Sequence, residues 1–99
     1  MVERHVYIKL HEQHLAGRDA LAATCKERLL LVPGVQAVAV SLAADAQSAG
    51  SWDLCLRIQF PDLETMAAYV PHPAHQAFLT QVLEPVTAFK KAWSFTPVS

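Results

Sequence analysis

Residues 52–60, Trp52-Asp53-Leu54-Cys55-Leu56-Arg57-Ile58-Gln59-Phe60, contain the clearest strand pattern in the chain. Every second position has an apolar side chain, and the positions between them have Asp, Cys, Arg and Gln. Successive side chains of a strand point to opposite faces of a sheet, so this period of two predicts a strand with one wholly apolar face. The segment therefore predicts a sheet that buries one face against a core.

Three further segments alternate in the same way and are predicted strands: residues 2–10, 35–42 and 87–97. In the first of them one row is aliphatic, whereas the other contains His5 and Tyr7, whose polar tips can reach either a pocket or solvent. Residues 43–51, rich in Ala, Ser, Asp and Gly, are predicted to form a loop or hairpin that contributes no chemistry.

Residues 19–32 and 62–83 show helical spacing, with apolar side chains at steps of three and four. Asp19 and Asp62 are the predicted N-caps of these helices. The first helix is expected to end before Pro33-Gly34 and the second at Pro85. The apolar stripe of the first helix consists of Leu21, Cys25, Leu29 and Val32.

The resulting order, β-α-β-β-α-β, is that of the ferredoxin-like fold, here an α+β domain over residues 1–99 with a four-stranded antiparallel sheet. Right-handed crossovers place both helices on the same face of the sheet. The other face is then uncovered, and its side chains are too apolar to remain so. We therefore expect a homodimer in which two such faces pack together about a two-fold axis.

The composition narrows the partners of the chain. Of its 99 residues 53% are hydrophobic, and its net charge of −1 favours neither nucleic acid nor an anionic membrane as a partner. No apolar run reaches the roughly 18 residues of a membrane span, and no signal peptide is recognised. Cys25 and Cys55 fit reduced thiols better than a disulfide framework. We expect a cytoplasmic, bacterial protein.

The stretch with most chemistry is Tyr69-Val70-Pro71-His72-Pro73-Ala74-His75-Gln76-Ala77-Phe78. The two prolines predict extended conformations at Val70 and His72 and a new helix from Pro73. His75 then lies in the first turn of that helix, where the neutral imidazole that can accept a proton is favoured. The phenol of Tyr69 could donate a hydrogen bond to an oxyanion. The alternative is that both histidines only cap or brace the helix break.

Several segments in order together resemble the stress-responsive dimeric α/β-barrel family, Dabb. They are Arg4-His5-Val6, Val32-Pro33-Gly34-Val35, Asp53-Leu54 with Phe60, Tyr69 with His72-Pro73-Ala74-His75, and Phe95. The resemblance covers essentially the whole chain and implies a dimeric α/β barrel of ferredoxin-like subunits. It includes a distant similarity to a plant polyketide (olivetolic acid) cyclase.

That similarity implies three pocket residues, His5, Tyr69 and His75, in a cyclase that closes a linear polyketide without a metal. Two positions depart from the plant pattern: Cys25 stands where the cyclase has a tyrosine, and Ser94 where it has an aspartate. A serine can hydrogen-bond a histidine but brings no charge to support its basicity.

Two functions follow as alternatives. In one, the protein is a module that binds a small apolar or carbonyl ligand. In the other, it is a cofactor-independent enzyme of the cyclase or monooxygenase kind, with His75 as the base, Tyr69 as the oxyanion donor and His5 in support. The other expected pocket residues are Tyr7, Cys25, Leu56, Ile58, His72, Phe78 and Ser94. No cofactor is expected, and no metal site, because Pro73 should make His72 and His75 diverge.

Overall fold

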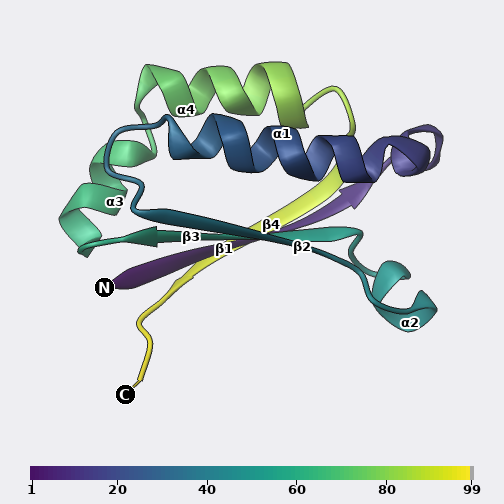
Figure 1. Cartoon of the computed structure of the whole chain (residues 1–99), viewed down its shortest axis with the longest axis horizontal. Coiled ribbons are helices and arrows are strands. Elements are labelled where there is room, and N and C mark those ends of the chain that lie inside the picture. The colour runs from purple at the N-terminus through teal and green to yellow at the C-terminus, as the bar shows by residue number, and fades with distance from the viewer. Residues whose placement is uncertain (99) are drawn as a thin grey trace.

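A computed structural model describes residues 1–98 and confirms the predicted ferredoxin-like arrangement (Figure 1). The elements are β1 (Val2–Leu10), the 3-10 helix η1 (Glu12–Gly17), α1 (Arg18–Leu30), β2 (Ala37–Leu42), α2 (Ala46–Ala49), β3 (Leu54–Phe60), α3 (Leu63–Tyr69), α4 (Pro73–Phe78), the π-helix η2 (Leu79–Leu83) and β4 (Thr87–Phe95). Within this range no helix has both the length and the apolar character needed to cross a bilayer.

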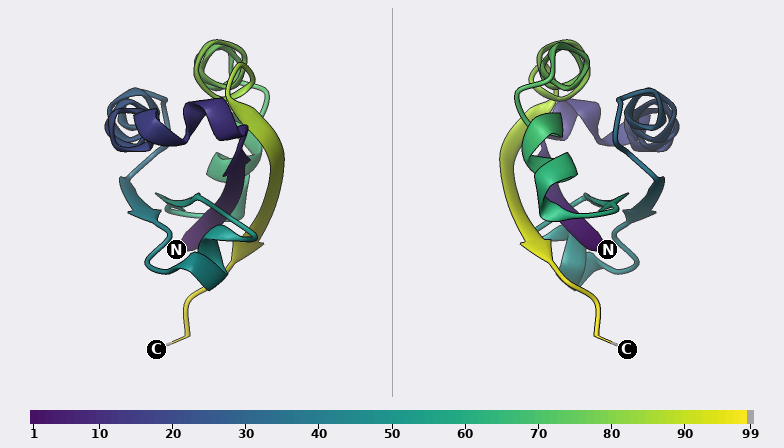
Figure 2. Two further views of the ribbon diagram at one scale, coloured as in Figure 1. Left: turned by 90° about the vertical axis from the view of Figure 1, so that its right-hand side faces the viewer. Right: turned by 90° about the vertical axis from the view of Figure 1, so that its left-hand side faces the viewer.

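The sheet has the strand order β2-β3-β1-β4, and all neighbouring strands are antiparallel. Figures 1 and 2 show α1 and α4 side by side over the same face of the sheet, which curves beneath them. The long central strand β1 therefore contacts β3 on one side and β4 on the other, and its side chains decide what lies under the helices and what lies outside.

The core lies between the helices and the sheet. The side chains of alternate β1 and β3 residues are buried there against Cys25 and Leu29 of α1, Tyr69 of α3 and Phe78 of α4. Phe60 at the end of β3 packs edge-on against the ring of Tyr69, with 4.8 Å between ring centroids. The residues of β1 and β3 in this core cluster are Val6, Ile8, Leu10, Leu54, Leu56, Ile58 and Phe60.

The opposite face of the sheet is aromatic and uncovered in the single chain. His5 packs against Phe95 and Tyr7 against Trp93, with ring centroids 4.7 and 6.0 Å apart. Trp93 and Phe95 nevertheless remain 50% exposed. We call this group, together with Trp52, which packs on Tyr7, the outer aromatic face.

Several local predictions differ from the structure. Asp19 is not an N-cap, because η1 runs directly into α1 and Gly17 takes that place without a side-chain cap. Residues 43–51 include the short helix α2, whose Asp45 carboxylate accepts a hydrogen bond from the Ser48 N–H at 2.8 Å. The third strand starts at Leu54 rather than Trp52, whereas the predicted N-cap Asp62 does accept from the Thr65 N–H.

The helix break also differs from its prediction at one residue. His72 is extended as expected (φ −59°, ψ 136°), but Val70 is helical (φ −54°, ψ −51°). The Val70 N–H donates to the Met66 carbonyl at 3.2 Å, so Val70 is a helical C-cap of α3 despite the usual preference of a residue before proline. The helical backbone therefore continues one residue further than expected, up to Val70.

Asp53 joins the start of β3 to the end of β1. Its side chain is 1% exposed and accepts from the Leu10 N–H at 2.7 Å and from the Lys9 ammonium at 3.3 Å. The same ammonium donates to the Ala49 carbonyl at the end of α2. One carboxylate thus ties β1 to the connection before β3.

We expect Asp53→Ala to lower the free energy of unfolding by about 2–3 kcal/mol, because it leaves a buried N–H without an acceptor and an ammonium without its anion. Asp45→Ala removes an exposed cap and should cost about 1 kcal/mol or less. Urea unfolding of both variants measures the difference. Equal losses would show that the buried carboxylate contributes no more than the exposed one.

Candidate functional site

The helix break brings Tyr69 and His75 together on the core side of the sheet. Tyr69 is the last residue of α3 and is 2% exposed, and His75, in the first turn of α4, is 8% exposed. Their ring centroids are 4.2 Å apart with planes tilted by 33°. The structure thus places these two predicted residues at one site.

The break also fixes the orientation of the His75 ring. In an uninterrupted helix the Val70 carbonyl would accept from the N–H of Ala74, but here that N–H donates to Nδ1 of His72 at 3.0 Å. The Val70 carbonyl accepts instead from Nδ1 of His75 at 2.7 Å and from the Gln76 amide at 2.8 Å. Since a carbonyl only accepts, Nδ1 carries the proton and Nε2 of the neutral ring is the basic nitrogen.

The local environment keeps both groups neutral. Burial lowers the pKa of His75 from 6.5, the Val70 carbonyl opposes this shift, and the positive charges of Lys90 and Arg4 add to it. Burial raises the pKa of the Tyr69 phenol well above 10.0, and Arg4 offsets part of that shift. The site therefore combines a neutral imidazole that can accept a proton with a protonated phenol that can donate one.

A cavity of about 170 Å³ adjoins the two rings. Its wall is mainly apolar, and its polar members come from β1, β4 and the two helices. The apolar lining includes Val6, Leu56, Ile58, Phe78, Leu79, Leu83 and Ala92, and the polar lining consists of Arg4, Tyr69, His75, Gln76 and Lys90.

A second hollow of about 410 Å³, between η2 and the beginning of β4, adjoins the cavity. Gln76, Leu79, Leu83 and Lys90 line both hollows. The shared wall includes a π-type turn, in which the Glu84 N–H donates to the Leu79 carbonyl at 2.8 Å. Single π turns are frequent at functional sites, and this one lies where the inner cavity and the outer hollow meet.

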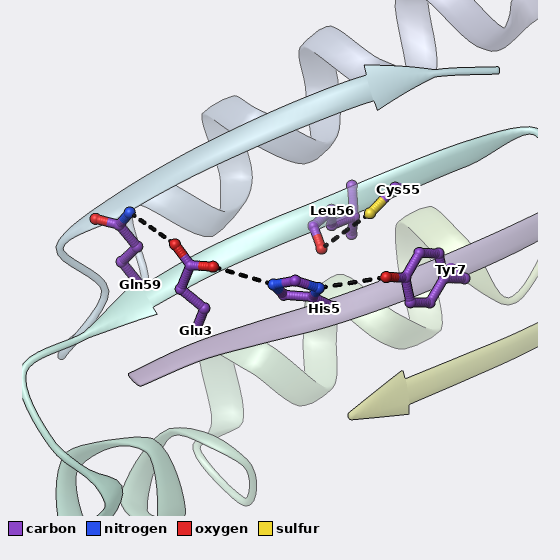
Figure 3. A network of polar contacts seen from close by, with 6 residues as sticks. All are labelled: Glu3, His5, Tyr7, Cys55, Leu56 and Gln59. Carbon is purple, nitrogen blue, oxygen red and sulfur yellow. Dashed lines mark hydrogen bonds and ion pairs between the residues drawn. The ribbon is translucent and has the colours of Figure 1, made fainter. Parts of the chain in front are cut away.

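His5 does not join this site, and its predicted role there is wrong. It lies on the outer aromatic face, where Nε2 contacts the Glu3 carboxylate at 3.1 Å and Nδ1 the Tyr7 hydroxyl at 3.3 Å (Figure 3). Gln59 donates to the other oxygen of Glu3 at 3.2 Å and completes the network. Because faces alternate along β1, the residue that enters the cavity is the neighbouring Arg4.

The other predicted pocket residues divide into two groups. Leu56, Ile58 and Phe78 line the cavity. Ser94 is not part of the lining, but its hydroxyl accepts a hydrogen bond at 3.2 Å from Nη1 of Arg4, which does line the cavity. The remaining three do not reach it: Tyr7 is on the outer aromatic face, Cys25 of α1 is buried in the core, and His72 caps α4. Burial raises the pKa of the Cys25 thiol to about 12, which makes it a packing residue.

Both histidines of the Pro71–Pro73 break also make the contacts of the structural alternative. His72 caps the helix and His75 braces the break through Nδ1. Bracing uses only one nitrogen of His75, so it is compatible with chemistry at Nε2. Within residues 1–98, no three His, Cys, Asp or Glu side chains gather in a way that could hold a metal ion.

The family model for the stress-responsive A/B barrel domain, Dabb, matches residues 2–91. The chain belongs to the Dabb family. No curated protein matches this Dabb domain.

Solved structures similar to this Dabb domain share its fold at low sequence identity. A Dabb family protein with a ferredoxin-like fold from Mesorhizobium loti is 18% identical, with 99% of this chain and 97% of that chain covered and a TM-score of 0.80. A dimeric ferredoxin-like protein of unknown function from Thermobifida fusca is 18% identical, with coverage of 97% and 90% and a TM-score of 0.76. A candidate antibiotic biosynthesis monooxygenase from Nitrosomonas europaea is 13% identical, with full coverage of both chains and a TM-score of 0.75.

We expect His75 to titrate below 6.5 in an NMR experiment and to remain the Nδ1–H tautomer when neutral, as read from its ring ¹⁵N shifts. Lys90→Gln should raise the pKa of His75, because it removes a nearby positive charge, and Lys26→Gln on the exposed side of α1 should not. The unfolded chain binds the proton more readily, so the contribution of His75 to stability is complete above pH 6.5 and declines as the pH falls toward the folded-state pKa. A His75 pKa at or above 6.5 would contradict this description.

Proposed function

We propose that this Dabb domain is a homodimer in which each subunit binds a small organic molecule in the cavity beside Tyr69 and His75. The observation that carries the proposal is the pairing of an oriented, neutral imidazole with a protonated phenol on a largely apolar cavity. Ligand sites typically combine an apolar wall with a few oriented polar groups. The ligand expected from these groups is a small apolar molecule with a carbonyl oxygen.

The homodimer is supported by the outer aromatic face. Trp93 and Phe95 are half exposed on the sheet face opposite the one that α1 and α4 cover. Large apolar patches on small proteins commonly mark interfaces, and two such faces can pack against each other with two-fold symmetry. The Thermobifida fusca structure of similar fold is described as dimeric.

A second candidate function is enzymatic. Nε2 of His75 could take a proton from a carbon next to the ligand carbonyl, and the electron pair would pass into an enolate whose oxygen Tyr69 binds. The observation in favour is that burial leaves the imidazole unprotonated and the phenol protonated, the states this step needs. General base catalysis of this type contributes roughly 10²–10⁴-fold. One similar fold, from Nitrosomonas europaea, is a candidate monooxygenase.

We expect the wild type to sediment as a dimer and Trp93→Asp to sediment as a folded monomer, because the charge would be buried in the aromatic interface. Leu31→Asp is the matched control, since Leu31 is 75% exposed after the end of α1, and it should remain dimeric. Analytical ultracentrifugation with circular dichroism tests this. A monomeric wild type would contradict the dimer.

The pocket can be tested with a thermal-shift screen of small ketones, aldehydes and aromatic carbonyl compounds. A ligand at about 100 times its Kd adds about 2.7 kcal/mol to the stability of the folded state. Compounds that stabilise the wild type should stabilise His75→Gln and Tyr69→Phe less. They should still stabilise His11→Gln, because His11 is exposed. Unchanged stabilisation in both site variants would remove the proposed site.

The enzymatic candidate has its own readout. Exchange of the carbon-bound proton of a bound ketone with D₂O, followed by NMR, should slow at least about 100-fold in His75→Gln if Nε2 is the base. A ligand that binds but shows no protein-dependent exchange would leave a binding module as the function.

A further inference from the structure

Arg4 brings into the cavity a positive charge that no acidic side chain neutralises. In residues 1–98 the salt bridges are Glu3–His5 and Asp53–Lys9, and neither involves Arg4. The side-chain hydrogen bond of Arg4 goes to the hydroxyl of Ser94, a neutral partner. A guanidinium has five N–H donors, so most of its hydrogen-bonding capacity is available to a ligand.

Lys90 adds a second cation to the same cavity. Arg4 pairs with Ser94 and Ile8 with Lys90, so the two cations lie on adjacent strands, four residues or about 13 Å of strand apart. Val6 and Ala92 lie between them on the same face, and both line the cavity. The charge of Arg4 lowers the pKa of Lys90, after desolvation the next cause of that shift, so the two side chains affect each other.

No carboxylate offsets these charges inside the cavity, because its lining contains no Asp or Glu. Glu84 raises the pKa of Lys90 through its negative charge, but it lines the outer hollow and not the cavity. Arg4 is partly buried, whereas Lys90 is exposed. A partly buried guanidinium without a counter-ion is costly, and an anion that enters the cavity would lower this cost. The guanidinium fork matches the two oxygens of a carboxylate, and the apolar wall suits a hydrocarbon body rather than a free inorganic anion.

We infer that the cavity binds an organic carboxylate, with the carboxylate on the Arg4 guanidinium, Lys90 strengthening the positive potential at the rim, and the hydrocarbon part against Val6, Leu56 and Phe78. The inference rests on the proposed ligand-binding function and narrows it to acids. A ligand bound in this way would have a carbonyl group or α-carbon in the part of the cavity lined by Tyr69 and His75.

The test uses matched acids and neutral amides, benzoate with benzamide and hexanoate with hexanamide. Each is titrated into the 99-residue protein by calorimetry at pH 7.5 and constant ionic strength. We expect the acids to bind the wild type at least about 10-fold more tightly than the amides, the range expected for charge-assisted hydrogen bonds. The preference should fall below about two-fold in Arg4→Gln and decrease partially in Lys90→Gln. Lys26→Gln, which removes an exposed charge on α1, should keep it in full.

A second measurement avoids dependence on the folding of Arg4→Gln. In the wild type, benzoate should shift the Nε–Hε resonance of Arg4 in a ¹⁵N spectrum, and benzamide or inorganic phosphate should not. Equal binding of acid and amide, or an Arg4 signal that phosphate shifts as much as benzoate does, would overturn the inference. If the amides nevertheless bind and their binding depends on Tyr69 and His75, the proposed ligand-binding function is still supported. Absence of binding by both the acids and the carbonyl compounds of the screen would overturn the inference and the pocket together.

Discussion

The alternation of side chains along β1 is the constraint on which the other features depend. β1 is the central strand that pairs with both β3 and β4, so its two rows of side chains determine the character of each face of the sheet. The row with Val6 and Ile8 forms the floor of the core, and the row with His5 and Tyr7 supports the outer aromatic face. The buried core on one face of the sheet and the uncovered aromatic rings on the other therefore both follow from the alternation of side chains along β1.

The second determinant is the break between α3 and α4. The break directs the Ala74 N–H to Nδ1 of His72, and the Val70 carbonyl accepts from the side chain of His75 instead. The hydrogen bond that satisfies the Val70 carbonyl at the break also selects the tautomer of the His75 imidazole. A structural role and a chemical role of His75 are thus compatible, because bracing uses Nδ1 and proton transfer would use Nε2.

Much of the fold could be predicted because it depends on periodicity. The strand pattern of residues 52–60, the helical spacing around Leu29 and the Asp62 cap concern local geometry, and the structure agrees with them apart from the ends of the elements. The pairing of Tyr69 with His75 could also be expected, because both flank one proline break. Asp45 illustrates what was missed: its spacing to Ser48 is a capping signal within a segment that looked irregular.

The placement of His5 could not be obtained from a family motif alone. Neighbouring residues of a strand point to opposite faces of the sheet. A resemblance to a family over the segment Arg4-His5-Val6 therefore does not decide whether Arg4 or His5 points into the cavity. The buried row of Val6, Ile8 and Leu10 contained the signal, since Arg4 is in phase with it and His5 is not. Lys90 was missed for a related reason, because its contribution depends on the register between β1 and β4, which no local pattern specifies.

The π turn of η2 has a consequence for the permitted length of the chain. Its wider ring contains one residue more than an α-helical turn, and each helical residue rotates the chain by about 100°. If the same residues were held in ordinary α-helical turns, the extra residue would rotate every side chain that follows by about this angle. Leu83 would then leave the core, and Thr87 would enter β4 out of phase with Leu10. The π turn therefore accommodates one additional residue locally and keeps the following segment in register.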